Sequence, residues 1–219
     1  PSYLPDSYKR NAASMLRNGI PILVHANGDA AIELMVDGID EAISDEAIVD
    51  HRSVIIHAQL IREDQLDRVK KLGIVPSYYA AHPYFWGDWH RQSFGDARAS
   101  FISPLKATIN REIPFTIHND SPIVPPDIMR LVSISVNRLT RSGHILGPEQ
   151  RATVEEALYA VTQGAAYQYF EENEKGSIAI GKRADFVVLE KNPMKVDPLV
   201  LADVAIIETF SRGKSIYKK

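Results

Sequence analysis

Four runs of apolar residues recur along the chain, and each ends at or beside a histidine. They are IPILVHA (20–26), RSVIIHA (52–58), GIVPSYYAAH (73–82) and IPFTIHND (113–120). These runs are short and nearly continuous rather than alternating, which is typical of strands buried on both faces of a parallel sheet. Apolar residues at helical spacing follow the first two runs, over residues 29–47 and 62–72. Alternation of strand and helix predicts βα units around a parallel sheet.

The rest of the chain changes in character twice. An aromatic-rich segment, residues 82–112, follows the third run and reads as a long functional loop. Helical patterns return over residues 127–140 and 153–170, and the second begins at Thr153 with Glu156 at capping-box spacing. From Gly176 onward, closely spaced turn residues and β-branched runs predict antiparallel hairpins. We therefore place a domain boundary near Glu174, between residues 1–174 and 175–219.

Composition narrows the class of protein. The 219 residues are 45% hydrophobic, enough for a sizeable core in one or two domains. A net charge of −3 without a long basic run gives no basis for binding nucleic acid. The chain has no cysteine, so any metal must be bound by imidazole and carboxylate. We expect no secretory leader, because no charged-then-apolar segment opens the sequence, and no apolar run approaches the roughly 18 residues of a membrane span. We expect a soluble, cytoplasmic protein with no membrane partner.

Potential metal ligands gather at the ends of three predicted strands: His25, His57, and the pair His118 and Asp120. The carboxyl edge of a parallel sheet is where its ligands bind, in barrels and in open sheets. Each histidine singly is explained by a local hydrogen bond, but together the pattern favours a metal. Two imidazoles and a carboxylate suit a divalent cation, above all zinc, so we assign His25, His57 and Asp120 as ligands. His51 precedes its strand and is interpreted as structural.

Two further roles are assigned at this edge. Asp120 can also act as the general base that takes a proton from a water molecule activated by the metal. His118 shares a strand face with Asp120, so it could orient that carboxylate, touch a substrate, or pack beneath the strand end. His82 and Trp86, in the aromatic segment, could line the mouth of a substrate pocket or belong to a packed loop. We take His82, Trp86 and His118 as candidate substrate-binding residues.

Five stretches together resemble a known family. They are ILVHANGDAAI, IIHAQLI, YYAAHPYFWGDWH, FTIHNDSPIVPPD and KGSIAIGKRADFVVLEKNP. In this order they are similar to the carboxyl-terminal portion of the amidohydrolase superfamily, in particular amidohydrolase family 3, the YtcJ-like branch. The resemblance covers essentially the whole chain.

The resemblance implies a fold and a set of roles. It implies an α/β chain, the carboxyl-terminal half of a (β/α)₈ TIM-type barrel plus a segment of a small β-sandwich. It implies His25 and His57 as metal ligands ending strands five and six, and Asp120 as ligand and general base closing strand eight. His82, on strand seven, would face the substrate. Residues 176–216 would form the carboxyl-terminal strands of the sandwich.

One departure from the family pattern shapes the functional expectation. Family members also supply a His-x-His pair from strand one and a lysine or glutamate from strand four, whereas this chain contains no His-x-His. The chain also starts abruptly at Pro1, so we expect it to be a fragment. An isolated half-barrel should be inactive, and its open strand edges should lead it to self-associate or to pair with the missing amino-terminal half.

The functional expectation concerns the longer protein. The resemblance implies a metal-dependent hydrolase of carbon–nitrogen bonds other than peptide bonds, acting on a small-molecule amide or cyclic amide with one or two divalent ions. Two alternatives stay open, a non-catalytic half-barrel that serves binding or assembly, and a phosphoester hydrolase of the same fold.

Overall fold

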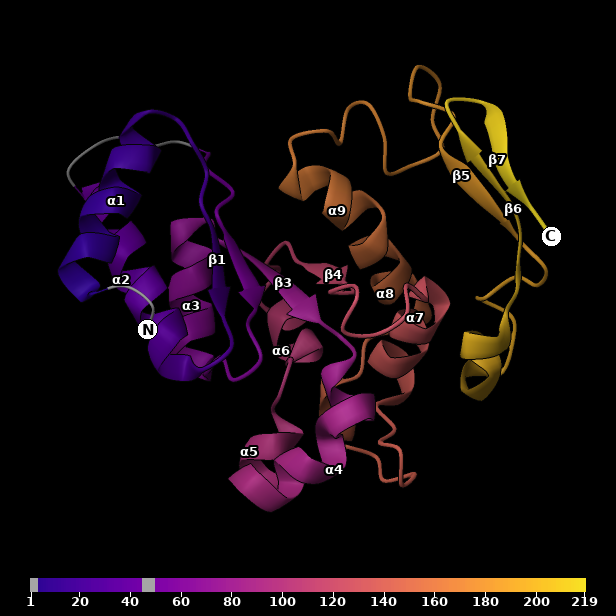
Figure 1. Ribbon diagram of the computed structural model, residues 1–219, viewed down its shortest axis with the longest axis horizontal. Coiled ribbons are helices and arrows are strands. Elements are labelled where there is room, and N and C mark those ends of the chain that lie inside the picture. Colours follow the sequence, from indigo (N-terminus) through magenta and orange to yellow (C-terminus); the bar gives the residue numbers. More distant parts are fainter. Residues whose placement is uncertain (1–3, 45–49) are drawn as a thin grey trace.

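A parallel α/β unit is followed by a small antiparallel sheet in the computed structural model, which describes residues 4–44 and 50–219 (Figure 1). The first unit contains, in order, α1 (Pro5–Arg17), β1 (Leu23–Ala26), α2 (Asp29–Ser44), β2 (Val54–His57), α3 (Glu63–Leu72), β3 (Val75–Tyr79), α4 (His82–Phe94), α5 (Asp96–Ser100), α6 (Leu105–Asn110), β4 (Thr116–His118), α7 (Ile128–Asn137), η1 (Pro148–Gln150), α8 (Val154–Val161) and α9 (Gln163–Gln168). The remaining elements are β5 (Phe186–Leu189), η2 (Pro198–Asp203), β6 (Ile206–Ser211) and β7 (Lys214–Lys218).

The four predicted strands form one parallel sheet in the order β1-β2-β3-β4, which confirms the βα reading of the sequence. Their register sets Ile56 opposite both His25 and Ser77, and Ser77 in turn opposite Thr116. One face of the sheet packs against the helices, and the apolar stripe of α2 (Ile32, Met35, Val36 and Ile39) is completely buried there. Since all four strands run the same way, their carboxyl ends meet at one edge.

The outer edge of β1 is open. Within the described residues β1 pairs only with β2, and its Leu23 is 52% exposed whereas Val54, its register partner on β2, is 1% exposed. At the opposite side of the sheet, α8 and α9 contact β4. A strand edge with unpaired backbone groups and an exposed leucine can add a further strand.

The prediction of a long loop after the third strand is wrong. Residues 82–112 are mainly helical and form α4, α5 and α6. Pro83 lies in the first turn of α4, where a missing N–H costs nothing, and no proline follows until Pro104. Gly95 ends α4 with a φ of 77°, a conformation that suits glycine. Aromatic and glycine content suggested a loop, but these residues pack as a helix over the sheet edge.

Other helix boundaries differ in detail from the prediction. The helix expected over residues 29–47 is α2, which is described as far as Ser44, and residues 45–47 lie outside the described part. The stretch 153–170 breaks at Thr162 into α8 and α9. The capping box is confirmed, since Thr153 Oγ1 accepts from Glu156 N at 3.1 Å and Thr153 N donates to Glu156 Oε2 at 2.7 Å.

The carboxyl-terminal region contains the expected antiparallel hairpins, with β6 between β5 and β7. Its connection to the rest is apolar, because Leu201 and Val204 pack with Met129 of α7. Before β5, Ile178 and Ile180 are fully or almost fully exposed. The domain boundary near Glu174 stays a prediction.

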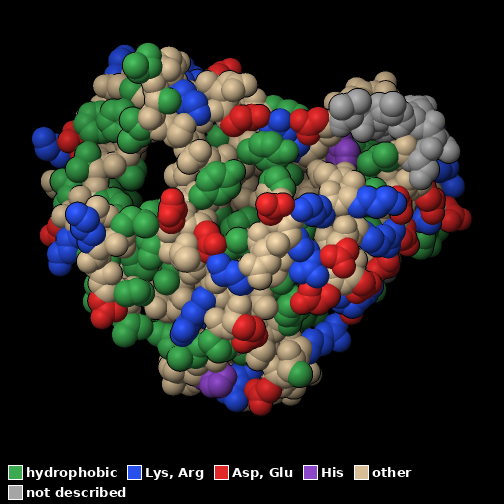
Figure 2. All heavy atoms as spheres, turned by 180° about the vertical axis from the view of Figure 1, so that it is seen from behind, with side chains coloured by type: hydrophobic (Ala, Val, Ile, Leu, Met, Phe, Trp, Pro, Cys, Tyr) green, Lys and Arg blue, Asp and Glu red, His purple; other side chains and the backbone are tan. Residues whose placement is uncertain are grey.

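Charged side chains of both signs alternate over the outside of α1, α2 and α3, which lie on the right in Figure 2. Arg68 of α3, for example, contacts Asp37 of α2 at 2.8 Å.

In the described part of the chain, no helix is long and apolar enough to cross a membrane.

Candidate metal centre

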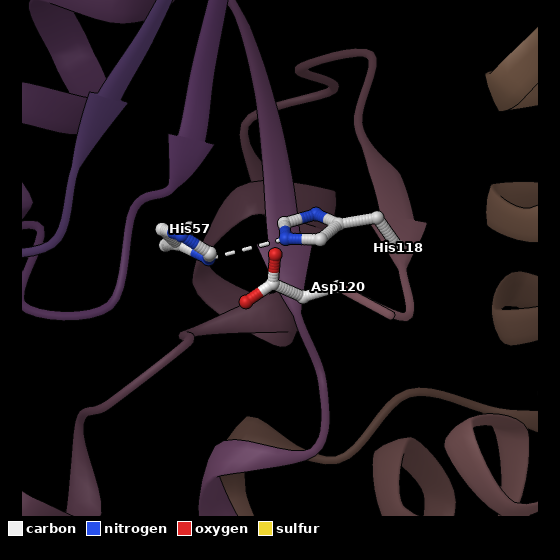
Figure 3. A group of neighbouring side chains, drawn as sticks. All are labelled: His57, His118 and Asp120. Carbon is white, nitrogen blue, oxygen red and sulfur yellow. Dashed lines mark hydrogen bonds between the residues drawn. The ribbon is translucent and has the colours of Figure 1, made fainter. Parts of the chain in front are cut away.

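His57, His118 and Asp120 converge at the carboxyl edge of the parallel sheet (Figure 3). His57 ends β2, His118 ends β4, and Asp120 lies two residues beyond β4. Among the described residues, one ring nitrogen of His57, one ring nitrogen of His118 and one carboxylate oxygen of Asp120 all lie within 4.8 Å of one another. This group contains two of the three predicted ligands, His57 and Asp120, and the ligand roles themselves stay predictions.

The two imidazoles of this group are hydrogen-bonded to each other and to β3. His118 Nε2 lies 3.1 Å from His57 Nδ1, and His118 Nδ1 lies 2.9 Å from Ser77 Oγ. His57 is buried, whereas His118 and Asp120 are half-buried. These hydrogen bonds hold the orientation of both rings. The Asp120 carboxylate stays partly accessible at the carboxyl ends of the strands.

The backbone at these strand ends adopts a left-handed conformation. The φ angles are 81° at His57, 47° at Ala58 and 57° at Asp120, and none of these residues is glycine. Such conformations cost on the order of 1–3 kcal/mol each and are typical of functional sites. Hydrogen bonds hold the turn after His57, including Ala58 N to Ala26 O at 3.2 Å. Left-handed residues thus occur at the two strand ends that carry His57 and Asp120.

Burial keeps both imidazoles of the group neutral. Burial, and secondarily the neighbouring His25, lower the pKa of His57, while the Asp120 carboxylate opposes this shift. Burial and the adjacent His57 lower the pKa of His118 to about 4, again against the effect of Asp120. A neutral imidazole keeps a lone pair, which is the form that binds a metal ion.

His25 lies beside this group but not in it. Its side chain is exposed, and its ring centroid is 4.6 Å from that of His57 with the rings nearly perpendicular. The register explains this offset, because Ala26 rather than His25 stands opposite His57. His118 takes the third place of the group that we predicted for His25. The assignment of His25 as a ligand stays a prediction.

His82 and Trp86 line one side of the same region. His82 begins α4, is 8% exposed, and its ring centroid lies 6.0 Å from those of both His57 and Trp86. Its Nδ1 is buried without a hydrogen-bond partner in the described chain, and burial lowers the pKa of His82 to about 2. A neutral histidine and an indole one turn apart make a wall for an apolar group. Their substrate contact stays a prediction.

Tyr79 and Ser77 are site residues that the sequence prediction missed. The Tyr79 ring stacks on His118 with centroids 5.7 Å apart, and its hydroxyl is buried without a partner among the described residues. Burial, and then Asp120, raise the pKa of Tyr79 to about 12, so the phenol stays protonated. Period-two spacing puts Ser77 and Tyr79 on one strand face. This alternation was not recognised in the sequence, because the third run is almost continuously apolar.

The donor set fits a divalent cation. Two neutral imidazole nitrogens and a carboxylate oxygen form a common zinc ligand set, with ligand distances of about 2.0–2.2 Å and a further position open to water or substrate. The ligand atoms of His57, His118 and Asp120 lie within 4.8 Å of one another, a spacing that is compatible with a shared ion. The group therefore can hold a metal, lower the pKa of a bound water molecule and accept its proton.

Two known proteins are similar in sequence to nearly the whole of this chain. The chain is 28% identical over 207 residues to the amidohydrolase-like protein YtcJ of Bacillus subtilis, and 25% identical over 202 residues to an N-substituted formamide deformylase of Arthrobacter pascens. These alignments cover 92% of the chain but only 38% and 37% of the relatives, so the chain spans less than half the length of either.

A solved structure agrees as well. An uncharacterized metal-dependent hydrolase of Pyrococcus furiosus superposes on 85% of this chain and 38% of its own length, with a TM-score of 0.71 and 29% identity. The sequence model of the Amidohydrolase family matches residues 9–217, nearly the whole chain. Together with the five motifs and the histidine–aspartate group at the strand ends, this match shows that the chain belongs to amidohydrolase family 3.

Proposed function

We propose that this chain carries the metal-binding edge of a metal-dependent hydrolase that cleaves carbon–nitrogen bonds in small amides or cyclic amides. The convergence of His57, His118 and Asp120 at one sheet edge is the observation that carries the proposal. Zinc is the cation that this ligand set favours. Membership of the amidohydrolase family and similarity to a metal-dependent hydrolase support the assignment.

The proposed architecture is the carboxyl-terminal half of a (β/α)₈ barrel with part of a β-sandwich. The open edge of β1, with Leu23 half exposed, supports this, because a strand from an amino-terminal half would cover it. Exposed Ile178, Ile180 and Ile216 support an incomplete sandwich in the same way. In this proposal the chain pairs with such a half, or with a second copy of itself.

The mechanism is assigned to the residues of the chain. A divalent cation held here would polarise the substrate carbonyl and acidify the attacking water. Asp120 would take a proton from the attacking water and deliver it to the leaving nitrogen. This role needs a carboxylate that is accessible at the carboxyl ends of the strands. His57 and His118 would bind the cation through ring nitrogens, and His82 and Trp86 would contact the substituent next to the amide.

Similarity to a relative narrows the substrate class. One relative is named for deformylating N-substituted formamides, so the compound class to test first is small N-substituted amides, formamides included. The apolar ring surfaces of Tyr79 and Trp86, whose centroids lie 5.8 Å apart, would receive an apolar N-substituent.

Metal content is the first experiment, because it can be measured on this chain directly. We expect zinc or cobalt to bind in a defined ratio, and binding to fall at least tenfold in His57→Ala and Asp120→Ala. His144→Ala is a matched control, since His144 is exposed and does not belong to the group of potential ligands. Equal metal binding by wild type and both site variants would contradict the proposal.

Asp120→Asn tests the base separately from the ligands. The amide keeps the size of the side chain and an oxygen for the metal but cannot accept a proton, so hydrolysis should fall by roughly 10²–10⁴. Metal content should change far less than in His57→Ala. Assays should include N-substituted formamides, other amides and a phosphoester. Hydrolysis of the phosphoester alone would favour the alternative reaction, and metal-independent binding without hydrolysis would favour a non-catalytic module.

A further inference from the structure

Two adjacent tyrosines of β3 have hydroxyl groups in opposite situations. Tyr78 is 0% and Tyr79 is 2% exposed, and successive side chains of a strand point to opposite faces of the sheet. The Tyr78 hydroxyl lies 2.6 Å from Thr108 Oγ1 on α6, and it is the donor there because the Thr108 hydroxyl donates to Pro104 O at 2.9 Å. The Tyr79 hydroxyl is buried and has no hydrogen-bond partner among the described residues. Of the two phenols, only that of Tyr79 has an unused hydrogen.

The Tyr79 side chain lies beside the candidate metal centre. Its ring centroid is 5.8 Å from that of His57 and 5.7 Å from that of His118. A second buried polar atom without a partner in the described chain, His82 Nδ1, belongs to a ring whose centroid lies 4.7 Å from that of Tyr79. His82 is only 8% exposed. Buried polar groups are nearly always hydrogen-bonded in folded proteins, so two unpaired ones in contacting rings indicate a partner that the chain itself does not supply.

We propose that Tyr79 is a substrate-binding residue, whose hydroxyl donates a hydrogen bond to the carbonyl oxygen of a small amide. The choice of an amide as the ligand rests on the proposed function. A phenol is protonated at neutral pH and offers one O–H donor. An amide oxygen is a neutral acceptor, whereas a carboxylate would bring a second negative charge close to Asp120, whose carboxylate lies within 4.8 Å of a ring nitrogen of His118. The pocket should therefore prefer an amide to a carboxylic acid of similar length.

The hydroxyl and the ring of Tyr79 serve different parts of such a ligand. The hydroxyl binds the carbonyl oxygen, while the ring, with that of Trp86 at a centroid distance of 5.8 Å, contacts the apolar N-substituent. A carbonyl oxygen that replaces a water molecule at this hydroxyl keeps the hydrogen bond and adds the apolar contact. One buried tyrosine thus recognises both the polar and the apolar half of an N-substituted amide.

The first experiment measures binding of N-butylacetamide to the metal-free chain at neutral pH, by ligand-observed NMR titration. Tyr79→Phe removes the donor and keeps the ring, so the dissociation constant should rise about 3–10-fold. Tyr78→Phe is the matched control and should bind as wild type does. In protein labelled at tyrosine ¹³Cζ, the Tyr79 resonance should shift with saturation and that of Tyr78 should not. Equal dissociation constants in wild type and Tyr79→Phe, or no binding by wild type, would overturn the proposal.

Urea unfolding separates a binding role from a structural one. Tyr78→Phe removes a hydrogen bond inside the protein and should unfold at a lower urea concentration than wild type. Tyr79→Phe removes a hydroxyl that has no partner in the described chain, so it should unfold at the same or a higher urea concentration. A loss in Tyr79→Phe as large as that in Tyr78→Phe would overturn the proposal, because the hydroxyl would then be paired within the protein.

A second ligand tests the preference for a neutral acceptor. Hexanoate has an apolar chain of similar length but ends in a carboxylate, so it should bind the metal-free chain more weakly than N-butylacetamide. Equal or tighter binding of hexanoate would overturn the assignment of an amide oxygen to this hydroxyl.

Failure of the Tyr79 role and failure of the proposed function give different results. If N-butylacetamide binds in a way that depends on Tyr79 but the zinc-loaded protein hydrolyses no amide, the binding role stands and the hydrolase function fails. If the zinc-loaded protein hydrolyses amides and Tyr79→Phe binds them as wild type does, the role of Tyr79 fails and the hydrolase function stands.

Discussion

Replacing Arg138 with methionine should be among the most destabilising single changes outside the metal centre. The Arg138 side chain is 1% exposed and donates to four backbone carbonyls, those of Ser100, Ile102, Ser103 and Leu146, at 2.6–3.3 Å. No carboxylate of the described residues lies at ion-pair distance from Arg138. Methionine fills much of the same volume but leaves these carbonyls without their donor.

The magnitude follows from these contacts. Hydrogen bonds to a charged group contribute about 1.5–3 kcal/mol each, so four amount to roughly 6–12 kcal/mol before desolvation. Burying a guanidinium with no carboxylate at ion-pair distance costs several kcal/mol, and burial accordingly lowers the pKa of Arg138 to about 10, against the opposing effect of the Glu149 carboxylate. We expect a net loss of about 3–5 kcal/mol, a large part of the roughly 5–15 kcal/mol that stabilises a typical domain.

Equilibrium urea unfolding of wild type and Arg138→Met measures this difference. Arg151→Met is the matched control, because Arg151 is half-buried and donates only to Asn137 O, at 3.1 and 3.2 Å. It should lose about 1 kcal/mol or less. Equal losses in the two variants would refute the reasoning. Arg138→Met should also disturb the candidate metal centre. Ser103, whose carbonyl accepts from Arg138, donates its N–H to Gln59 O at 2.9 Å, in the turn after His57.

Three further predictions concern the fold. Gly147→Ala should destabilise by more than about 1–3 kcal/mol, because a Cβ there would lie 1.9 Å from Ser100 O and φ is +60°; unchanged unfolding would contradict the close approach. Stability should fall as pH drops below about 6.5, since His51 Nδ1 accepts from Ser53 N at 2.9 Å and burial lowers the pKa of His51 in the folded state, so that the unfolded chain binds more protons. The slope of unfolding free energy against pH should be smaller in His51→Gln, and equal slopes would contradict this. Sedimentation should show association through the open edge of β1, and a stable 24.5 kDa monomer would count against it.

The local pattern of the sequence was sufficient for the strands, their direction and the edge at which ligands gather. Apolar runs with β-branched residues are strands wherever a helix follows each one, and parallel strands must share a carboxyl edge. His57 and Asp120 could therefore be named as candidate ligands before any contact was known, together with His25, while His118 was assigned to the substrate. The capping box at Thr153 is equally local, since both of its hydrogen bonds span three residues.

Only the tertiary structure shows which of the candidate side chains are hydrogen-bonded to each other, as His57 and His118 are. His25 and His118 are both strand-end histidines, but the register between β1 and β2 holds His25 one residue short of His57. Register depends on pairing between segments some 30 residues apart, which hydrophobic periodicity along one strand does not specify. The helical state of residues 82–94 was likewise decided by packing, because aromatic residues at that spacing fit a helix and a loop alike.

A group of hydrogen-bonded polar side chains beneath His118 lies furthest beyond the reach of sequence. Ser77, Thr116 and Gln168 are ordinary residues in their own segments, and their hydrogen bonds span 39 and 52 positions. Buried hydroxyl and amide groups must be paired with one another, yet which ones pair is settled when three elements pack together. The sequence thus determined which residues could do chemistry at this edge, and the packing of β3, β4 and α9 determined which buried polar groups meet beneath them.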